Sequence, residues 1–457
     1  MVESKKRKAT AAVSVDDEIA QVNEILQGET TARESWQIGK RLKTLIDAHP
    51  DMTNEQLGNT MCMWGTAIAR IASENEDATL AEAAMDKFQQ ALNLLGETEM
   101  GPYGLALYGS VSMIVATEKQ DRTVLEAALG QFEKAVKMDT PEAFESHFQY
   151  AKALREGSLL VEHLLEAQEG SKDAKDTFQS PESMQQKGLD ICKHILQHHE
   201  AVLADESANE KQKDEATSSA SGDDEEEEVE DEVTREDLSE VILLQAQLLA
   251  LLHRNTDSEE QRLDIYNTFK QAYDIHKDNV NALAEMNAYL CRLPKLSSWL
   301  PQFEWMQKEF EAILDTLDFD LASCYEHVLR ESTLPQPKPV DEHVPKVLDV
   351  LGRNLLGQLK AHDTKPQPAI LEHTIKVLRC AHHLHDVFGC YSLAVLYALP
   401  LYRNTTECHV WLETCESYGV LDEEFQVADF SSMESESWYS LFVTNGTLKA
   451  QDKVELE

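Results

Sequence analysis

Glycine, proline and basic residues are scarce in this chain of 457 residues. Its 18 Gly and 13 Pro are too few for a collagen-like or generally disordered protein. The 41 Lys and Arg residues stand against 83 Asp and Glu, which gives a formal net charge of −42. A field of that sign repels phosphate backbones, so we expect no direct binding of nucleic acid.

Paired cysteines and long apolar runs are also lacking. The eight cysteines form no Cys-x-x-Cys pair, which argues against a disulfide framework and for a reducing compartment. The longest apolar stretches, Val241–Leu252 and Cys390–Tyr402, are interrupted and shorter than the roughly 20 residues of a membrane helix. The first twelve residues are charged and lack the apolar core of a secretory signal. We therefore expect a soluble intracellular protein with no membrane partner.

The alternation typical of strands is almost absent, whereas helical periodicity runs through most of the chain. Good helix formers fill windows such as Ala81–Leu95, Leu125–Met138 and Leu238–His253. Breakers such as Gly96 and Gly101-Pro102 come between them. The sequence predicts an all-α protein with many helices of ordinary length.

A small–large–small pattern recurs on these predicted helices. Its three positions share one face of a helix, so that small residues let a neighbouring helix approach while the large one fills the gap. The copies are Ala84, Phe88 and Ala91, then Ala128, Phe132 and Ala135, then in part Phe269 and Ala272. The pattern resembles the second helix of a tetratricopeptide unit, although the first two copies are 44 residues apart instead of about 34. This resemblance implies an α-solenoid of helical hairpins.

A further unit of this kind is predicted near the C-terminus. Asn404 is the expected N-cap of its second helix, and Gly419 is the expected stop after that helix. The stretch from Asp429 to Phe442 resembles the closing segment that covers a last repeat. The predicted packing residues are Tyr391 and Ala394 on the first helix and Cys408, Leu412 and Cys415 on the second.

Two segments of unusual composition suggest how the chain is divided. We predict a basic disordered tail over residues 1–15, helical repeats over 16–200, an acidic linker over 201–236, and helical repeats with a closing cap over 237–457. The linker holds nine carboxylates in ten residues, whose mutual repulsion prevents packing. These nine are Asp223, Asp224, Glu225, Glu226, Glu227, Glu228, Glu230, Asp231 and Glu232.

No catalytic motif is present: the sequence has no Gly-rich phosphate loop, nucleophile elbow or His-Glu-x-x-His. Cys380, His382, His383 and His385 lie close in sequence, but on a helix they spread over most of its circumference. His194 and His198 share a face without a third ligand nearby. We therefore predict no metal site, no cofactor and no catalytic residue.

The basic tail contains a run of four cations, Lys5, Lys6, Arg7 and Lys8, which favours a nuclear import signal over a merely solubilising tail. The acidic run has three interpretations that the sequence leaves open. It is an inert linker, a shield for basic clients, or an element regulated by phosphorylation at Ser218, Ser219 or Ser221.

The order of these features resembles the fungal enhancer-of-translation-termination family over roughly residues 1–280. The carriers of this resemblance are the basic run, Asp16–Gln21, Phe88–Leu92, Tyr150–Arg155 and the acidic run. It implies a nuclear protein of tetratricopeptide-like fold that binds a 2-oxoglutarate-dependent dioxygenase of prolyl-hydroxylase type and acts in translation termination. The resemblance identifies no binding residue in this sequence.

The predicted function is accordingly that of a non-enzymatic nuclear scaffold or adaptor for protein partners. The alternative is an acidic chaperone for basic clients such as histones, with the acidic run as the binding element. A third hypothesis, an enzyme whose site is assembled from distant residues, has no motif in its favour.

Overall fold

The computed structural model describes residues 14–28, 30–140, 143–167, 179–204, 233–330, 340–421, 426–440 and 442. Within these ranges the chain forms α-helices and short 3-10 helices and no strand, which confirms the prediction of an all-α solenoid. It divides into two compact units, Met1–His276 (unit 1) and Lys277–Glu457 (unit 2).

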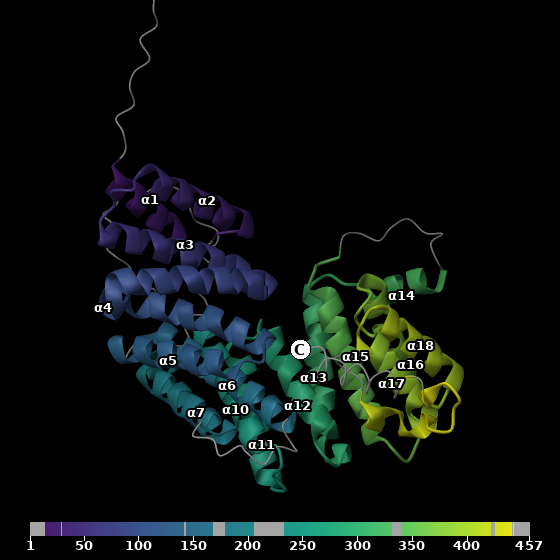
Figure 1. The fold of residues 1–457 in the computed structure, drawn as a ribbon. Coiled ribbons are helices and arrows are strands. Elements are labelled where there is room, and N and C mark those ends of the chain that lie inside the picture. The colour runs from purple at the N-terminus through teal and green to yellow at the C-terminus, as the bar shows by residue number, and fades with distance from the viewer. Residues whose placement is uncertain are drawn as a thin grey trace, which may run out of the picture. The chain divides into compact units, whose positions relative to one another are not determined.

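Unit 1 is a series of helical hairpins that follow one another along the chain (Figure 1). From α2 to α7 each helix packs on the next one, α7 packs on α10 and α10 on α11, whereas α1 packs on α3 and α8 on α10. Helices α3, α4 and α6 also pack in succession. Its helices are α1 (Val15–Gln27), α2 (Ala32–Ala48), α3 (Asn54–Asn75), α4 (Ala78–Glu118), α5 (Arg122–Met138), α6 (Phe144–Ala167), α7 (Pro181–His198), α8 (Glu200–Ala204), α10 (Arg235–Leu252) and α11 (Glu259–Ile275).

Helix α4 is in fact two helices joined by a kink. Gly96 and Gly101 have φ angles of 79° and 71°, which only glycine adopts without strain, and Pro102 restarts the helix. The first half pairs with α3 and the second half with α5. The predicted breakers therefore interrupt the helix at the expected positions. The kink separates the last helix of one hairpin from the first helix of the next.

The small–large–small faces are the contacts that hold these hairpins together. Phe88 is fully buried against Gly65 of α3, and Phe132 is buried against Gly109 of α4. The Phe88 ring stacks on Tyr108 at 5.9 Å and the Phe132 ring on Tyr150 at 6.1 Å. Because Gly65 and Gly109 are also 44 residues apart, the long repeat period belongs to both helices of the hairpin.

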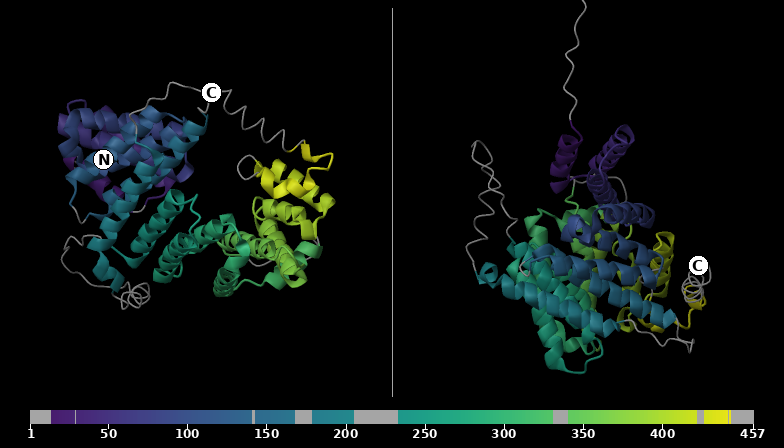
Figure 2. Two further views of the ribbon diagram at one scale, coloured as in Figure 1. Left: turned by 90° about the horizontal axis from the view of Figure 1, so that it is seen from below. Right: turned by 60° about the vertical axis from the view of Figure 1, so that its left-hand side comes forward.

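Unit 2 is organised around α15, which is buried on most of its circumference. It packs against α12, α13, α16 and α17, and α17 pairs with α18. Figure 2 shows these green and yellow helices from two further sides. The elements are α12 (Val280–Arg292), η1 (Leu296–Trp299), α13 (Leu300–Thr316), α14 (Leu321–Arg330), α15 (Val344–Ala361), α16 (Pro368–Leu384), α17 (Cys390–Ala398), η2 (Pro400–Tyr402), α18 (Thr405–Ser417) and η3 (Val427–Met433).

The predicted C-terminal hairpin is present as α17 and α18. The Asn404 side chain accepts a hydrogen bond from the Glu407 N–H at 3.2 Å and caps α18. After α18 ends at Ser417, Gly419 adopts a φ of 74°. Phe430 and Met433 of η3 are fully buried against this hairpin, so the closing segment covers it as expected.

The boundary between the two units differs from the expected one. The prediction placed the division at the acidic segment 201–236, whereas the units separate between His276 and Lys277. Helix α10 packs on α6 and α7, and Leu238 and Val241 share a buried cluster with Cys192 and Ile195 of α7. The hydrophobic core thus continues from one side of the acidic segment to the other, and that segment is an insertion within unit 1.

Candidate functional site: a groove along unit 1

Two adjoining hollows run along one side of unit 1. The first, about 570 Å³, lies between the loop after α1, helix α3 and the second half of α4. The second, about 710 Å³, lies between the end of α3, the second half of α4 and α6. Both are lined by Ser73 and Ser110, so they form one continuous groove, which we call the α3–α6 groove.

The groove follows from the 44-residue repeat. Glu76 and Gln120 both line it, and they occupy equivalent left-handed positions, with φ angles of 51° and 50°, at the turns after α3 and α4. The next residue in each case is an aspartate, Asp77 or Asp121, whose carboxylate caps the following helix. Two successive turns of the same geometry therefore place the first helices of consecutive hairpins side by side.

The second hollow combines an apolar floor with acidic walls. Met113 and Leu160 are buried in the floor, and Leu159 remains 37% exposed above it. Three carboxylates, Glu76, Glu118 and Glu156, line the walls, against the basic Lys152 and the titratable His163. A segment that fits this surface carries apolar side chains and positive charge.

The position of Glu156 in the groove affects the pKa of its carboxyl group. Its side chain is exposed to water, and other residues that line the second hollow bury part of it. This burial raises the pKa of Glu156 above its ordinary value of 4.5, against the opposing effect of nearby Arg155 and Lys152. A cation bound beside Glu156 would favour its ionised form.

Arg70 of α3 holds the edge of the groove in place. Its guanidinium donates hydrogen bonds to the Gly28 carbonyl at 2.8 Å, to Thr30 Oγ1 at 2.7 Å and to the Leu26 carbonyl at 2.5 Å. All three acceptors belong to the end of α1 or the loop that follows it. One side chain therefore fixes the loop that forms the first wall.

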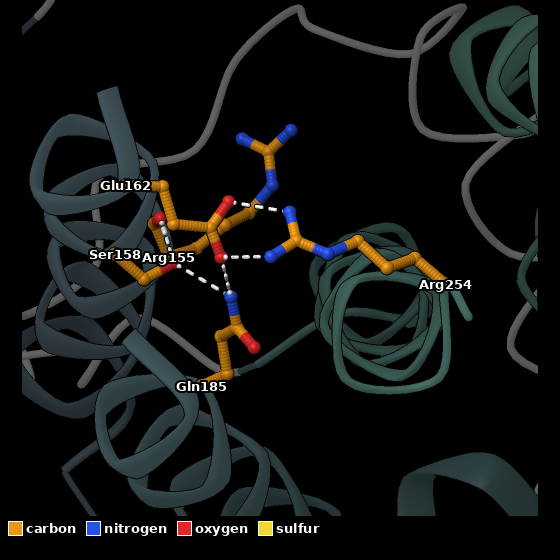
Figure 3. A network of polar contacts seen from close by, with 5 residues as sticks. All are labelled: Arg155, Ser158, Glu162, Gln185 and Arg254. Atoms are coloured by element: carbon orange, nitrogen blue, oxygen red, sulfur yellow. Dashed lines mark hydrogen bonds and ion pairs between the residues drawn. The ribbon is translucent and has the colours of Figure 1, made fainter. Parts of the chain in front are cut away.

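A second polar network joins α6 to α7 and to the turn that follows α10 (Figure 3). Arg254 donates two hydrogen bonds to the Glu162 carboxylate, at 2.7 and 3.0 Å. Gln185 Nε2 donates to Glu162 Oε1 at 3.2 Å and to Ser158 Oγ at 3.3 Å. Figure 3 shows the Arg155 guanidinium pointing away from this network, and its Nε has no hydrogen-bond partner in the structure. The network ties α6, one wall of the groove, to the helices on both sides of the acidic insertion.

The residues predicted to form the repeat core are buried, with one partial exception. Tyr391 is half-buried: its hydroxyl donates to Asp429 Oδ2 at 3.2 Å and accepts from the Gln426 N–H at 3.0 Å. The fully buried members are Ala84, Phe88, Ala91, Ala128, Ala135, Ala394, Cys408, Leu412 and Cys415, joined by Phe132, Phe269 and Ala272 at 1% exposure or less. These residues build the hairpins and do not form a binding surface, apart from Phe132, which also lines the groove.

The basic run Lys5–Lys8 and the acidic run 223–232 lie outside the described residues, so their roles stay predictions. Of the histidines weighed as metal ligands, His194 and His198 approach each other with Nε2 atoms 3.1 Å apart, and His382 packs on Trp411. Among the described residues no group of three or more His, Cys, Asp or Glu is placed to hold a metal ion. In the same part of the chain no helix is long and apolar enough to cross a membrane.

Sequence reasoning missed the groove itself. Lys152, Glu156, Leu159 and His163 follow one another at helical spacing on α6, which marks a common face but does not say whether that face is covered. Glu162 and Arg254 are 92 residues apart, and no sequence signal joins them.

No protein-family model matches the sequence, and no curated protein matches it. Among solved structures the chain is similar to the TPR domain of P58(IPK), at 11% identity over 95% of this chain and 99% of that one, with a TM-score of 0.24. It is also similar to Naa15/Naa10 bound to HypK-THB, at 13% identity over 97% of this chain and 62% of that one, with a TM-score of 0.20. Superpositions this loose carry no functional argument, and the resemblance to the fungal family receives no match.

Proposed function

We propose that this protein is a non-enzymatic scaffold that binds a segment of a partner protein in the α3–α6 groove. The observation that carries the proposal is the continuity of the groove across three consecutive first helices, with an apolar floor between carboxylates. The occupant that fits is a basic segment with apolar side chains. Its apolar groups would cover Leu159 and Met113, and its cations would meet Glu118 and Glu156.

The finer predictions from the sequence stay proposals within this one. A nuclear adaptor for a 2-oxoglutarate-dependent dioxygenase in translation termination would use the groove for one specific partner. An acidic chaperone would hold basic clients such as histones mainly through the acidic run. The two differ in what carries the affinity, because apolar anchors in a groove resist salt whereas exposed charge pairs are screened over about 8–10 Å.

The test compares two leucines on the same helix. Leu159→Asp places a charge in the groove, whereas Leu165→Asp does so at a residue of α6 that is 45% exposed and does not line it. The probe is a labelled, acetylated twelve-residue peptide of alternating Lys-Leu and Gly-Ser pairs, titrated against the full chain by fluorescence anisotropy. We expect the groove variant to lose at least tenfold in affinity and the control variant to bind like the wild type. Equal loss in both variants would show that the peptide binds by net charge alone.

Deletion of residues 218–232 separates the adaptor from the chaperone. If the groove carries the contacts, the deletion leaves partner affinity nearly unchanged. A tenfold loss, about 1.4 kcal/mol, together with a steep fall in affinity between low and physiological salt, would favour the chaperone.

A further inference from the structure

A smaller hollow of about 310 Å³ lies within unit 2, between α14, α16 and α18. Val328 lines it from α14, Arg379 and His382 from α16, and Glu407, Val410 and Trp411 from α18. We call it the α14–α18 pocket. It shares no lining residue with the groove of unit 1, so a role for this pocket does not depend on the function proposed for that groove.

Two buried hydrogen-bond donors of this pocket lack acceptors. Arg379 Nε and Trp411 Nε1 are both buried and have no hydrogen-bond partner in the structure. Neither group can act as an acceptor. A buried donor left unsatisfied costs about 1–3 kcal/mol, so two of them in one small pocket favour the binding of a group that accepts hydrogen bonds.

The guanidinium of Arg379 is only partly engaged by its neighbours. Its Nη2 lies 3.4 Å from Glu407 Oε2, at the long end of hydrogen-bonding distance, and its side chain also meets that of Tyr397. Nε and Nη2 together form one flat edge of the guanidinium, whose two N–H groups match the two oxygens of a carboxylate. Glu407 therefore contacts only one of the two nitrogens on this edge, although the edge can bind both oxygens of a carboxylate.

The other wall of the pocket is aromatic and includes His383, and His382 Nδ1 is also buried there without a hydrogen-bond partner. The His382 ring meets the Trp411 ring edge to face at 5.2 Å and the Tyr418 ring at 6.1 Å. Burial lowers the pKa of His382, in opposition to nearby Asp386, which favours the neutral imidazole. Arg379 contributes a positive charge to the pocket, and the indole N–H of Trp411 is a neutral donor.

Exposed apolar surface lies in and beside the pocket. Val410 lines it and is 48% exposed, and Tyr418, whose ring meets that of His382, is 45% exposed. A small inorganic anion would satisfy the donors but would leave this apolar surface in water. An occupant that covers both carries a carboxylate with an apolar group beside it.

We propose that the α14–α18 pocket is a second binding site, which takes an Asp or Glu carboxylate, flanked by an apolar side chain, from an acidic segment of a partner protein. The carboxylate would accept from Arg379 Nε and Nη2 and from Trp411 Nε1, while Glu407 turns aside. The net charge of −42 repels such a segment at long range, so its recognition depends on contacts inside the pocket. Added salt screens that repulsion more than it screens a partly buried ion pair.

The test uses the peptide Ser-Gly-Glu-Leu-Glu-Leu-Gly-Ser, acetylated, amidated and labelled, and the same peptide with Gln in place of Glu. Both are titrated against the full chain by fluorescence anisotropy at two salt concentrations. We expect the Glu peptide to bind at least tenfold more tightly than the Gln peptide, with an affinity that stays level or rises with salt.

Four variants locate the contacts. Arg379→Gln should weaken binding at least tenfold, and Trp411→Phe, which keeps a ring but removes the N–H, should weaken it about threefold or more. Glu407→Gln should tighten binding, because it removes the resident competitor for Arg379. Arg403→Gln is the matched control, since Arg403 pairs with Glu436 at 2.7 Å elsewhere in unit 2, and it should change nothing.

The opposite results would overturn the proposal. Equal binding of the Glu and Gln peptides would exclude a carboxylate site, and displacement by inorganic phosphate at concentrations similar to the peptide's would indicate a small-anion site. Unchanged affinity in Glu407→Gln would mean that the Arg379–Glu407 contact is only structural. This last variant also keeps the proposal testable if Arg379→Gln does not fold. A severalfold gain in peptide affinity on deleting residues 223–232 that persists at high salt, where long-range repulsion is screened, would identify the chain's own acidic run as the occupant.

Discussion

Replacing Gly109 by alanine tests the packing on which the repeat rests. An ideal Cβ at this position would lie 2.8 Å from two carbons of the Phe132 ring, which is closer than real Cβ atoms approach. The ring is 1% exposed and stacked on Tyr150, so it has little room to move. Gly130, in the interior of α5, is the matched control, because a Cβ there meets nothing within 4 Å.

Both substitutions gain the same helix propensity, about 0.8–1 kcal/mol for Gly to Ala in a helix interior. Gly130→Ala should keep most of that gain. Gly109→Ala should lose it to overpacking, which costs about 1–3 kcal/mol in a dense core. The two variants should therefore differ by about 1–3 kcal/mol in free energy of unfolding, measured by urea denaturation followed by circular dichroism.

A smaller ring partner sharpens the test. In the double variant Gly109→Ala/Phe132→Leu the methyl group has space, so the combined loss should be smaller than the sum of the two single losses by about 1 kcal/mol. If Gly109→Ala stabilises the protein as Gly130→Ala does, Phe132 does not pack on α4 and our register of the hairpins is wrong.

Four other variants test separate parts of the molecule. Phe269→Ala should destabilise unit 1 by about 3–5 kcal/mol in the same assay, and a loss below about 1 would exclude burial between α10 and α11. Glu156→Gln should raise the free energy of unfolding at pH 7, because a carboxyl whose pKa is raised in the folded state destabilises that state as pH rises through the folded pKa. The difference between variant and wild type should vanish below the unfolded pKa of about 4.5. The same variant should bind a basic peptide more weakly. Arg254→Gln should cost about 1 kcal/mol, since Arg254 is half exposed, and should speed hydrogen exchange in α10. Replacing Lys5, Lys6, Arg7 and Lys8 with Ala should move a tagged protein from the nucleus to the cytoplasm, and an unchanged distribution would leave the tail a solubilising role.

The hairpins could be predicted because their signals are local. Ala84, Phe88 and Ala91 lie within eight residues, and a face of that composition packs in only a few ways. Gly96 and Gly101 mark the kink in α4 for a similar reason, since the positive φ that each adopts is a property of the residue itself. The residues against which these faces pack were harder to predict from the sequence. Gly65 and Gly109 leave the space that the Phe rings occupy. In a sequence, however, a glycine within a helix only predicts a less stable helix, and the ring that needs its space is not apparent.

The acidic insertion shows why composition misplaced the boundary between units. Charge density predicts where a chain cannot pack, but it does not say whether the flanking segments return to the same core. That depends on the buried cluster that includes Leu238 and Cys192 and on the ion pair of Arg254 with Glu162, which join residues far apart in sequence. The closure of a long loop costs only slightly more free energy than that of a short one, so an insertion of this size is tolerated within a continuous core.

The two candidate sites were hidden for a related reason, and they differ in what they demand of a partner. Glu118 and Glu156 are ordinary residues in a chain with 83 carboxylates, and they become a site only because two equivalent turns align α3, α4 and α6 around an apolar floor. Arg379 is one of 41 basic residues, and it stands out only because Glu407 leaves part of its edge unpaired beside Trp411. The groove favours a cationic segment and the pocket an anionic one, so the net negative charge of the chain attracts the first and repels the second. A scaffold with two sites of opposite preference can hold two different partners on one chain, each excluded from the other's site by charge.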